Sequence, residues 1–139
     1  AGQVMDRLLR GTDMRLPDGV KIKGRDGFER SFFRTKFWAE SPKIYDDVVF
    51  QPDPLPEHIA NAEISTVDRR RLVSYGAKEL PLFVGHYWRS GRPGPITPNV
   101  ACLDYSAVKY GKLVAYRMDN ERSLSADKFV WVDVIKEAL

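Results

Sequence analysis

The sequence has one cysteine, two histidines and no long apolar run, and these shortages exclude whole classes of protein. A single cysteine cannot form a disulfide within the chain, which excludes a disulfide-stapled domain. Cys102 lies in the apolar run at residues 100–103, so we expect a small buried core residue there. No segment approaches the ~20 apolar residues that a transmembrane helix needs, and the N-terminus lacks the pattern of a signal peptide. The composition therefore predicts a cytoplasmic protein with no membrane partner.

Positive charge is not concentrated in the sequence either. The formal net charge is +3 and the pI is about 9.0, but basic and acidic residues are interspersed. The one basic cluster is Arg69, Arg70 and Arg71, which is more typical of a solvated helix face than of a nucleic-acid contact. The sequence thus predicts no nucleic-acid partner.

Short strand patterns separated by turns make up most of the chain. Apolar residues at helical spacing predict a helix over residues 3–10, and Gly11 is expected to end it. Alternating or continuously apolar segments predict the strands, at residues 20–23, 29–38, 80–88, 100–103, 112–118 and 128–132. Short turns join several of these segments, with a hairpin turn at residues 25–27. The expected fold class is α+β, with mainly antiparallel strands and a few short helices.

The least regular part of the sequence is residues 41–80. Prolines interrupt any long element there, so only short helices are expected, near residues 56–62 and 67–75. The interrupting prolines are Pro42, Pro52, Pro54 and Pro56. His58 falls in the first of these helices and is assigned no metal role.

The strand at residues 80–88 carries the other histidine. The apolar run between Pro81 and Gly85 is typical of a buried strand, and His86 follows at its C-terminal end, where α/β sheets place their chemistry. A lone histidine is more commonly a structural residue, so this stretch by itself leaves both interpretations open. The loop at residues 89–98 is rich in glycine and proline and is expected to form a rim beside His86.

An ordered set of motifs in the second half resembles a known family. Gly85-His86 at a strand end is followed by Leu103-Asp104 and then by Gly111-Lys112-Leu113 at the start of another strand. In order and spacing these motifs resemble the C-terminal part of a bacterial calcineurin-like metallophosphoesterase, near the phosphoprotein phosphatases and symmetrical dinucleoside tetraphosphatases. The resemblance implies that residues 1–139 are a single C-terminal segment of such a domain, which is an α/β sandwich of two sheets.

The family's other motifs are absent from the sequence. Gly-Asp-x-His, Gly-Asp-x-x-Asp-Arg and Gly-Asn-His-Glu, with a further histidine, supply most ligands of the family's metal centre, and none of the three motifs occurs here. The turn at residues 109–111 also lacks the paired glycines of many relatives. We therefore expect the missing ligands in an N-terminal half of the same domain. The 139 residues alone are expected to bind no metal and to be inactive.

The activity that the resemblance implies is hydrolysis of a phosphoester substrate with two divalent metal ions, manganese, iron or similar. By resemblance His86 is a ligand of one ion, and neutral imidazole suits such cations. Tyr87, Trp88 and Arg89 are candidates for contacts with the substrate, although aromatic residues beside a strand end are more often core. Asp104 is a candidate for orienting a metal ligand, but a strand-end aspartate more often caps a turn.

Two further candidates for the substrate site lie on the strand at residues 29–38. Its alternation places Arg34 and Lys36 on one face and Phe33 and Phe37 on the other. One interpretation is that the two basic residues face a phosphate-binding cleft. The other is that they are the solvated face of an ordinary half-exposed strand, which is the commoner case.

Two hypotheses about function remain open from the sequence. The first is the C-terminal part of a metal-dependent phosphoesterase, a hydrolase that acts on a phosphoprotein, a dinucleotide polyphosphate or a small phosphomonoester. The second is a free-standing β-rich interaction module that binds a protein or an acidic ligand without catalysis. Because a segment cut from a sandwich exposes a sheet face or a strand edge, a homodimer of the chain is also expected.

Overall fold

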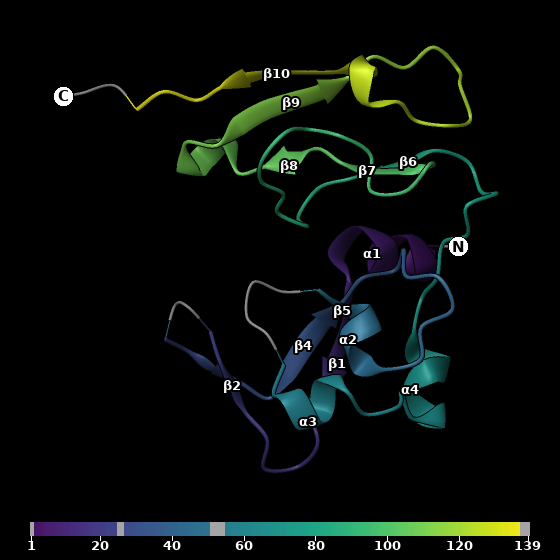
Figure 1. Cartoon of the computed structure of the whole chain (residues 1–139), viewed down its shortest axis with the longest axis vertical. Helices are drawn as coiled ribbons and strands as arrows, with labels where there is room; N and C mark the ends of the chain where they lie inside the picture. The colour runs from purple at the N-terminus through teal and green to yellow at the C-terminus, as the bar shows by residue number, and fades with distance from the viewer. Residues whose placement is uncertain (1, 25–26, 51–54, 137–139) are drawn as a thin grey trace. The chain divides into compact units, whose positions relative to one another are not determined.

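The computed structural model describes residues 2–24, 27–50 and 55–136. Short helices and strands are mixed along the chain, and most strand pairs are antiparallel, so the fold belongs to the α+β class that the sequence predicted. The chain forms two compact units, Ala1–Tyr75 and Gly76–Leu139 (Figure 1). This boundary was not anticipated from the sequence. Among the described helices, none combines the length and the apolar character needed to cross a membrane.

The first unit contains the helices and a small antiparallel sheet. Its helices are α1 (Gly2–Arg10), α2 (Tyr45–Val48), α3 (Glu57–Ala60) and α4 (Thr66–Arg71). Its strands are β1 (Thr12–Arg15), β2 (Ile22–Lys23), β3 (Glu29–Arg30), β4 (Phe32–Thr35) and β5 (Val49–Phe50). Strands β1, β4 and β5 form a sheet in that order, while β2 and β3 form a separate hairpin.

The core of the first unit follows from alternation along β4. Phe33 and Thr35 are buried, and the intervening Arg34 is half-buried, as period two predicts for one covered face. Phe33 pairs with Met14 across β1 and β4, and both side chains are buried. Around this pair the core gathers the side chains of Leu16, Ile22, Val48, Leu55, Ile59 and Ile64.

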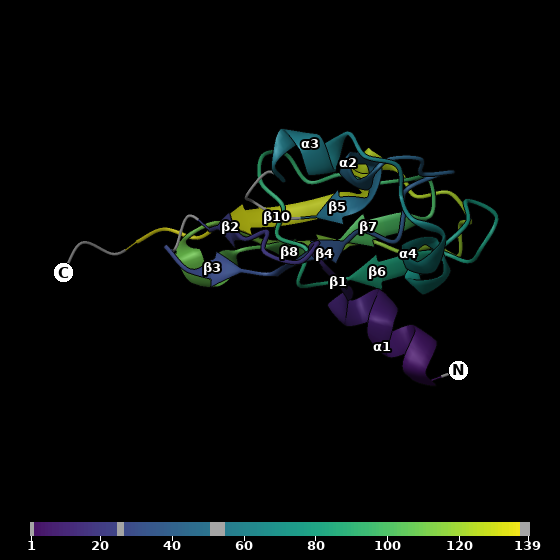
Figure 2. The ribbon, with the colours of Figure 1, turned by 90° about the horizontal axis from the view of Figure 1, so that it is seen from below.

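Several predictions for the first unit need correction. The strand expected over residues 29–38 is two strands with different partners, since β3 pairs with β2 whereas β4 pairs with β1 and β5. Of the apolar stripe on α1 only Leu8 is buried, and the rest of the stripe is exposed. In Figure 2 this helix extends beyond β1 towards the N-terminus. Arg25 and Asp26 of the expected hairpin turn lie outside the described residues.

The helix ends of the first unit agree with the local sequence signals. Gly11 follows α1 with φ of 82°, the left-handed conformation that ends many helices. Ser65 caps α4 by accepting a hydrogen bond from the Asp68 N–H at 3.0 Å. The arginines of the basic cluster lie exposed in the last turn of α4, which is the solvated position predicted for them.

The second unit consists of strands joined by turns. They are β6 (Leu82–Val84), β7 (Val100–Cys102), β8 (Asp104–Tyr105), β9 (Lys112–Tyr116) and β10 (Phe129–Asp133), with 3-10 turns η1 (Ala107–Lys109) and η2 (Ala126–Lys128). Strands β10, β9 and β8 form an antiparallel sheet in that order. The pair β6 and β7 is parallel, which the expectation of a mainly antiparallel half did not include.

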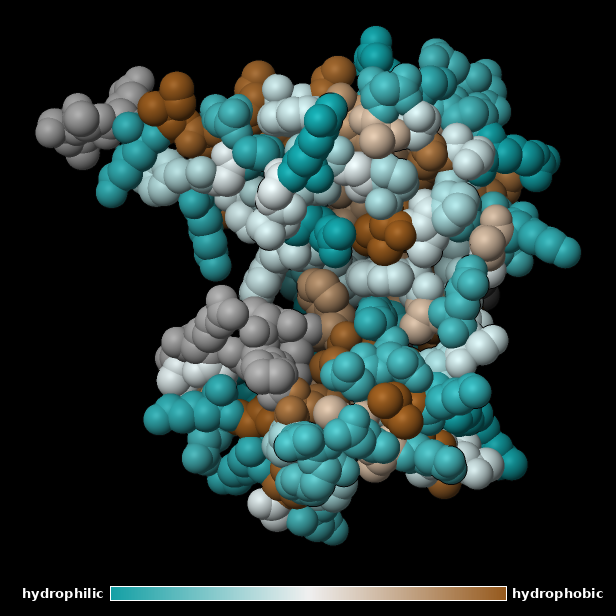
Figure 3. Space-filling view, viewed as in Figure 1, coloured by the Kyte–Doolittle hydropathy of each residue, from teal (hydrophilic) through white to brown (hydrophobic). Residues whose placement is uncertain are grey.

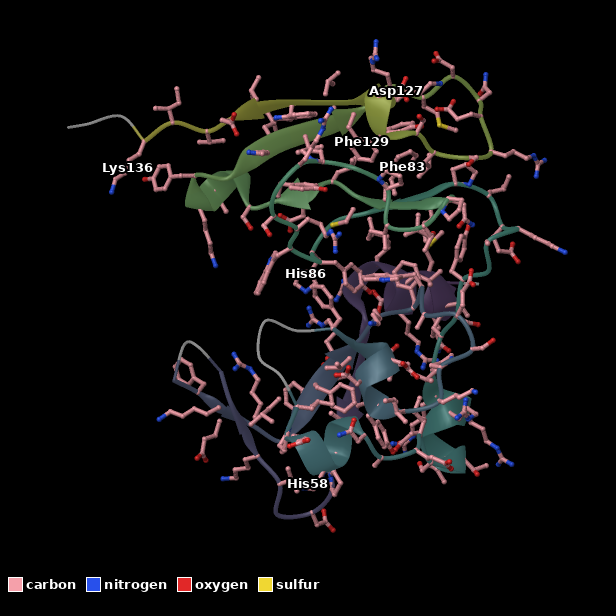
Figure 4. All side chains as sticks on the ribbon, viewed as in Figure 1. His58, Phe83, His86, Asp127, Phe129 and Lys136 are labelled. Carbon is pink, nitrogen blue, oxygen red and sulfur yellow. The ribbon has the colours of Figure 1, made fainter. Side chains whose placement is uncertain are left out.

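Aromatic rings fill the core of the second unit. Tyr116 lies between Phe83 and Phe129, with ring centroids 5.1 Å and 5.0 Å away; Figure 4 labels both phenylalanines. Ala101, Tyr105, Val114 and Leu124 complete this core. Since Phe83, Tyr116 and Phe129 lie on β6, β9 and β10, the aromatic contacts join the parallel pair to the antiparallel sheet.

The turn from β8 to β9 brings two backbone segments unusually close together. Gly111 donates its N–H to the Ser106 carbonyl at 3.0 Å. A Cβ on Gly111 would lie 2.0 Å from the Tyr105 carbonyl oxygen and 2.9 Å from that of Ser106. Both neighbours are backbone atoms, so only glycine fits here without moving the turn.

We predict that Gly111→Ala lowers the free energy of unfolding by more than about 2 kcal/mol, because the added methyl group overlaps the backbone. Gly94→Ala is the matched control, since a Cβ at Gly94 meets nothing within 4 Å. Urea unfolding followed by tryptophan fluorescence measures both. Equal unfolding midpoints for the two variants would contradict the close approach at Gly111.

Candidate functional site

The parallel pairing of β6 and β7 brings two sequence motifs together at the carboxyl ends of these strands. Both strands run in the same direction, so Gly85-His86 after β6 and Leu103-Asp104 after β7 lie side by side. The Leu103 N–H donates to the Val84 carbonyl at 2.9 Å and extends the pairing to this edge. The motifs that carry the family resemblance are therefore neighbours in space.

His86 occupies a strained turn at the end of β6. Its φ is 65°, and the Tyr87 N–H donates to the Gly85 carbonyl at 2.8 Å across it, which is the hydrogen bond of a γ-turn. A three-residue turn with positive φ at a residue other than glycine is rare and costs conformational energy. His86 is exposed, so core packing around its own side chain does not enforce this conformation.

The carboxylate of Asp104 holds this turn in place. One oxygen accepts the His86 N–H at 3.1 Å, and the other accepts the Ser106 N–H at 3.0 Å. The Asp104 carbonyl also accepts the Arg89 N–H at 2.9 Å. Asp104 thus binds the backbone of His86 and of Arg89, and it caps the turn that follows β8, which is the structural role named as its commoner alternative.

The residues after His86 have different surroundings. Tyr87 has 0% of its surface exposed, so its side chain is part of the interior and not of the surface beside His86. Trp88 is 51% exposed, and its ring centroid lies 6.5 Å from that of His86. The Lys109 ammonium lies 5.2 Å from the Trp88 ring centre, a cation–π distance. Arg89 is exposed. An imidazole, an indole and a lysine therefore gather on the surface beside the β6 edge.

Lys109 was not identified from the sequence. It lies on η1, far along the chain from Trp88, and only the fold of the β8–β9 turn brings the two together. No local pattern in the sequence marks such a contact. Asn99 was not identified from the sequence either; its side chain is 1% exposed, and its amide donates to the carbonyls of Gly76 and Glu79 at 2.8 and 3.1 Å.

Arg34 and Lys36 belong to the first unit. The Arg34 Nε lies 3.6 Å from a carboxylate oxygen of Asp13, its neighbour across β1 and β4, so this arginine has an acidic partner. Lys36 lines an open cavity of about 490 Å³. The other lining residues are Trp38, Ala39, Glu40, Ser41, Lys43, Asp46 and Asp47. Because both signs of charge line this cavity, it does not single out an anionic ligand.

Two carboxylates with lowered pKa values, Asp47 and Glu121, stabilise loops. In the cavity, the backbone N–H groups of Lys43 and Ile44 hold the pKa of Asp47 below its usual value. In the loop between β9 and β10, hydrogen bonds from Tyr116 and Lys128 lower the pKa of Glu121 to about 2. These groups fix the backbone of their loops, and neither stands in a cluster with His86.

The donor set around His86 is incomplete as a metal centre. In the described ranges there is no group of three or more histidine, cysteine, aspartate or glutamate side chains that could hold a metal ion. Cys102 is buried, and desolvation raises the pKa of its thiol, so it is not a ready thiolate ligand. His86 fits a single ligand position, and a two-metal centre needs several more donors.

Comparison of the chain with models of protein families, with curated proteins and with solved structures finds no match. The resemblance to calcineurin-like metallophosphoesterases stays a prediction.

We predict that His86→Gly is more stable than His86→Ala by about 1 kcal/mol, because glycine relieves the positive φ at this position. The matched control is Arg89, exposed and without positive φ, where the order of the glycine and alanine variants should reverse. Urea unfolding of the four variants gives both differences. A glycine variant no more stable than the alanine variant at position 86 would show that the turn is not strained.

Proposed function

We propose that this chain contributes His86 as a metal ligand to a phosphoesterase centre of the calcineurin-like type. The other ligands then come from an N-terminal half of the same domain, and the strands of this chain form the C-terminal part of a two-sheet α/β sandwich. The enzyme hydrolyses a phosphoester bond. When bound, the pair of divalent ions supplies polarisation of the phosphoryl group and activation of the attacking water.

The observation that carries the proposal is the strained, exposed position of His86 at the end of the parallel pair. Backbone strain concentrates at functional sites because the surrounding structure must enforce it. Here Asp104 enforces it through the His86 N–H. The backbone next to the imidazole also borders open space, since a Cβ at Gly85 would meet no atom within 4 Å. A donor on a rigid strand end with space beside it suits a metal ligand.

The surface beside His86 has chemistry that fits a phosphoester. The Lys109 ammonium next to Trp88, together with the exposed Arg89, offers positive charge for a phosphate group. The exposed indole of Trp88 can stack on a planar part of a substrate. A phosphoprotein, a dinucleotide polyphosphate and a small phosphomonoester all present the phosphate that this surface would contact.

One observation favours the alternative, an interaction module without catalysis. The outer face of β9 and β10 carries apolar side chains that are largely exposed, with Leu113 at 63% and Val132 at 61%. Such a face is typical of a surface that another molecule covers. The two functions differ in one measurable respect, which is metal-dependent hydrolysis by the protein that contains the missing family motifs.

We expect the 139-residue chain alone to show no appreciable hydrolysis of a generic phosphomonoester in excess manganese, because a single credible ligand cannot hold two ions. A colorimetric phosphate assay measures this. Robust metal-dependent turnover that disappears in His86→Ala would overturn the division of the site between two halves.

In a protein that joins this chain to the three missing motifs, His86→Ala should lower kcat by at least about a hundredfold, since a ligand of the reacting metal is lost. His58→Ala is the matched control: His58 is an exposed residue of α3 in the first unit, and its loss should leave activity nearly unchanged. Steady-state kinetics with saturating manganese separates them. Equal damage from both substitutions would mean that the site is assigned wrongly, and no hydrolysis by the unsubstituted protein would favour the interaction module.

A further inference from the structure

We propose that two copies of this chain pair through β10 and form a two-fold dimer with a continuous sheet. Strand β10 is at the edge of its sheet, since the order is β10, β9, β8. Figure 1 shows its outer side without a neighbouring strand. Exposed strand edges offer unpaired backbone groups to another chain, and a second copy is the partner whose strand matches by symmetry. The inference stands independently of the proposed function.

The hydrogen bonds of the hairpin determine which backbone groups of β10 face outward. The Arg117 N–H donates to the Lys128 carbonyl, and the Val134 N–H donates to the Gly111 carbonyl. Hydrogen-bonded pairs alternate along antiparallel strands, so Val130 and Val132 also direct their N–H and C=O groups to β9. The backbone groups of Phe129, Trp131 and Asp133 therefore point to the free edge.

This alternation selects a register for the dimer. If two β10 strands run antiparallel with Trp131 on the two-fold axis, Trp131 pairs with Trp131 of the second copy. Phe129 then pairs with Asp133 of the second copy. Each of these is a hydrogen-bonded pair, so every outward backbone group of the strand finds a partner. Val130 then lies opposite Val132 of the second copy as a pair without hydrogen bonds.

The side chains of β10 are compatible with this pairing. Val130 and Val132 are 43% and 61% exposed, and they lie on the same face as Ala115 and Leu113 of β9. Pairing the strands joins the two outer faces into one apolar surface. Figure 3 shows hydrophobic side chains along this edge. Trp131, which is 37% exposed, gains an aromatic cross-strand neighbour, the Trp131 side chain of the second copy.

The ends of β10 carry opposite charges. Asp127 precedes the strand and Lys136 follows it, and Figure 4 labels them at its two ends. Hydrogen bonding from Ser125 keeps the pKa of Asp127 below its usual value. Antiparallel pairing brings Asp127 of each copy towards Lys136 of the other. Lys128 is already held by Asp119 and Glu121, so it adds no unpaired positive charge beside Asp127.

The size of this contact indicates a weak dimer. A stable dimer usually buries about 800 Å² on each partner, and a single five-residue strand edge covers less than that. We therefore expect a reversible equilibrium in the micromolar range.

The backbone pairing is tested with Trp131→Pro and its matched control Trp131→Ala. Both variants lose the indole, but only proline loses the outward N–H, and edge strands tolerate proline because the bonds to β9 are unaffected. By symmetry the proline removes two hydrogen bonds from the dimer. Sedimentation equilibrium of the 139-residue chain measures the dissociation constant of the dimer. This constant should be at least about tenfold larger for the proline variant than for the alanine variant. A monomer at all concentrations of the unsubstituted chain, or equal association of the two variants, would overturn the proposal.

The register is tested by cysteine cross-linking. Residues paired without hydrogen bonds have Cα atoms about 4.5 Å apart, which a disulfide can span. A mixture of Val130→Cys and Val132→Cys chains should therefore form a cross-linked heterodimer under mild oxidation, in larger amount than either variant forms alone. The native Cys102 is buried and serves as the internal control for non-specific oxidation. A dimer that cross-links equally in all three samples, or in none, would refute pairing through β10 in this register.

Discussion

The carboxylate of Asp104 is the group on which the candidate site depends. This carboxylate accepts backbone hydrogen bonds from His86 and Ser106, and the main-chain carbonyl of Asp104 accepts one from Arg89. These contacts tie the end of β6 to the turn after β8, and they hold His86 in a backbone conformation that is unfavourable by itself. Without this carboxylate the parallel pair would still form through its own ladder, but the position of the imidazole beyond it would not be determined.

The second unit is organised around this edge. Its aromatic core joins the parallel pair to the antiparallel sheet through Tyr116, so β6, the strand that precedes His86, is anchored to that sheet. The turn from β8 to β9 places Lys109 beside Trp88, and it closes only because residue 111 is glycine. A metal ligand benefits from such support, since a donor must be held in place before the ion arrives. The same unit leaves β10 at the edge of its sheet. It therefore has two separate surface features, the polar side chains around His86 and the outward backbone groups of β10.

The local elements could largely be predicted from the sequence. The helix ending at Gly11, the strand before Gly85 and the strands that became β9 and β10 were located by apolar periodicity and by glycine and proline signals. The burial of Phe33 and Thr35 on one face of β4 also followed from period two, whereas Phe37, which is buried too, lies in the turn after that strand. The exceptions have a physical cause. The strand expected over residues 29–38 divides because its two parts hydrogen-bond to different partners. The elements α2, β1, β5 and β8 were not expected, because each is too short to show a period.

The sequence by itself determined the α+β class, the position of most strands and the placement of His86 directly after one of them, because these depend on residues that are neighbours in the chain. Only the tertiary structure decided that β6 and β7 are parallel, that Asp104 binds the His86 backbone and that Lys109 lies over Trp88. It also decided which strand is left at the sheet edge. These features join residues that are distant in the sequence, and hydrophobic periodicity contains no information about strand direction or about which distant polar groups will meet.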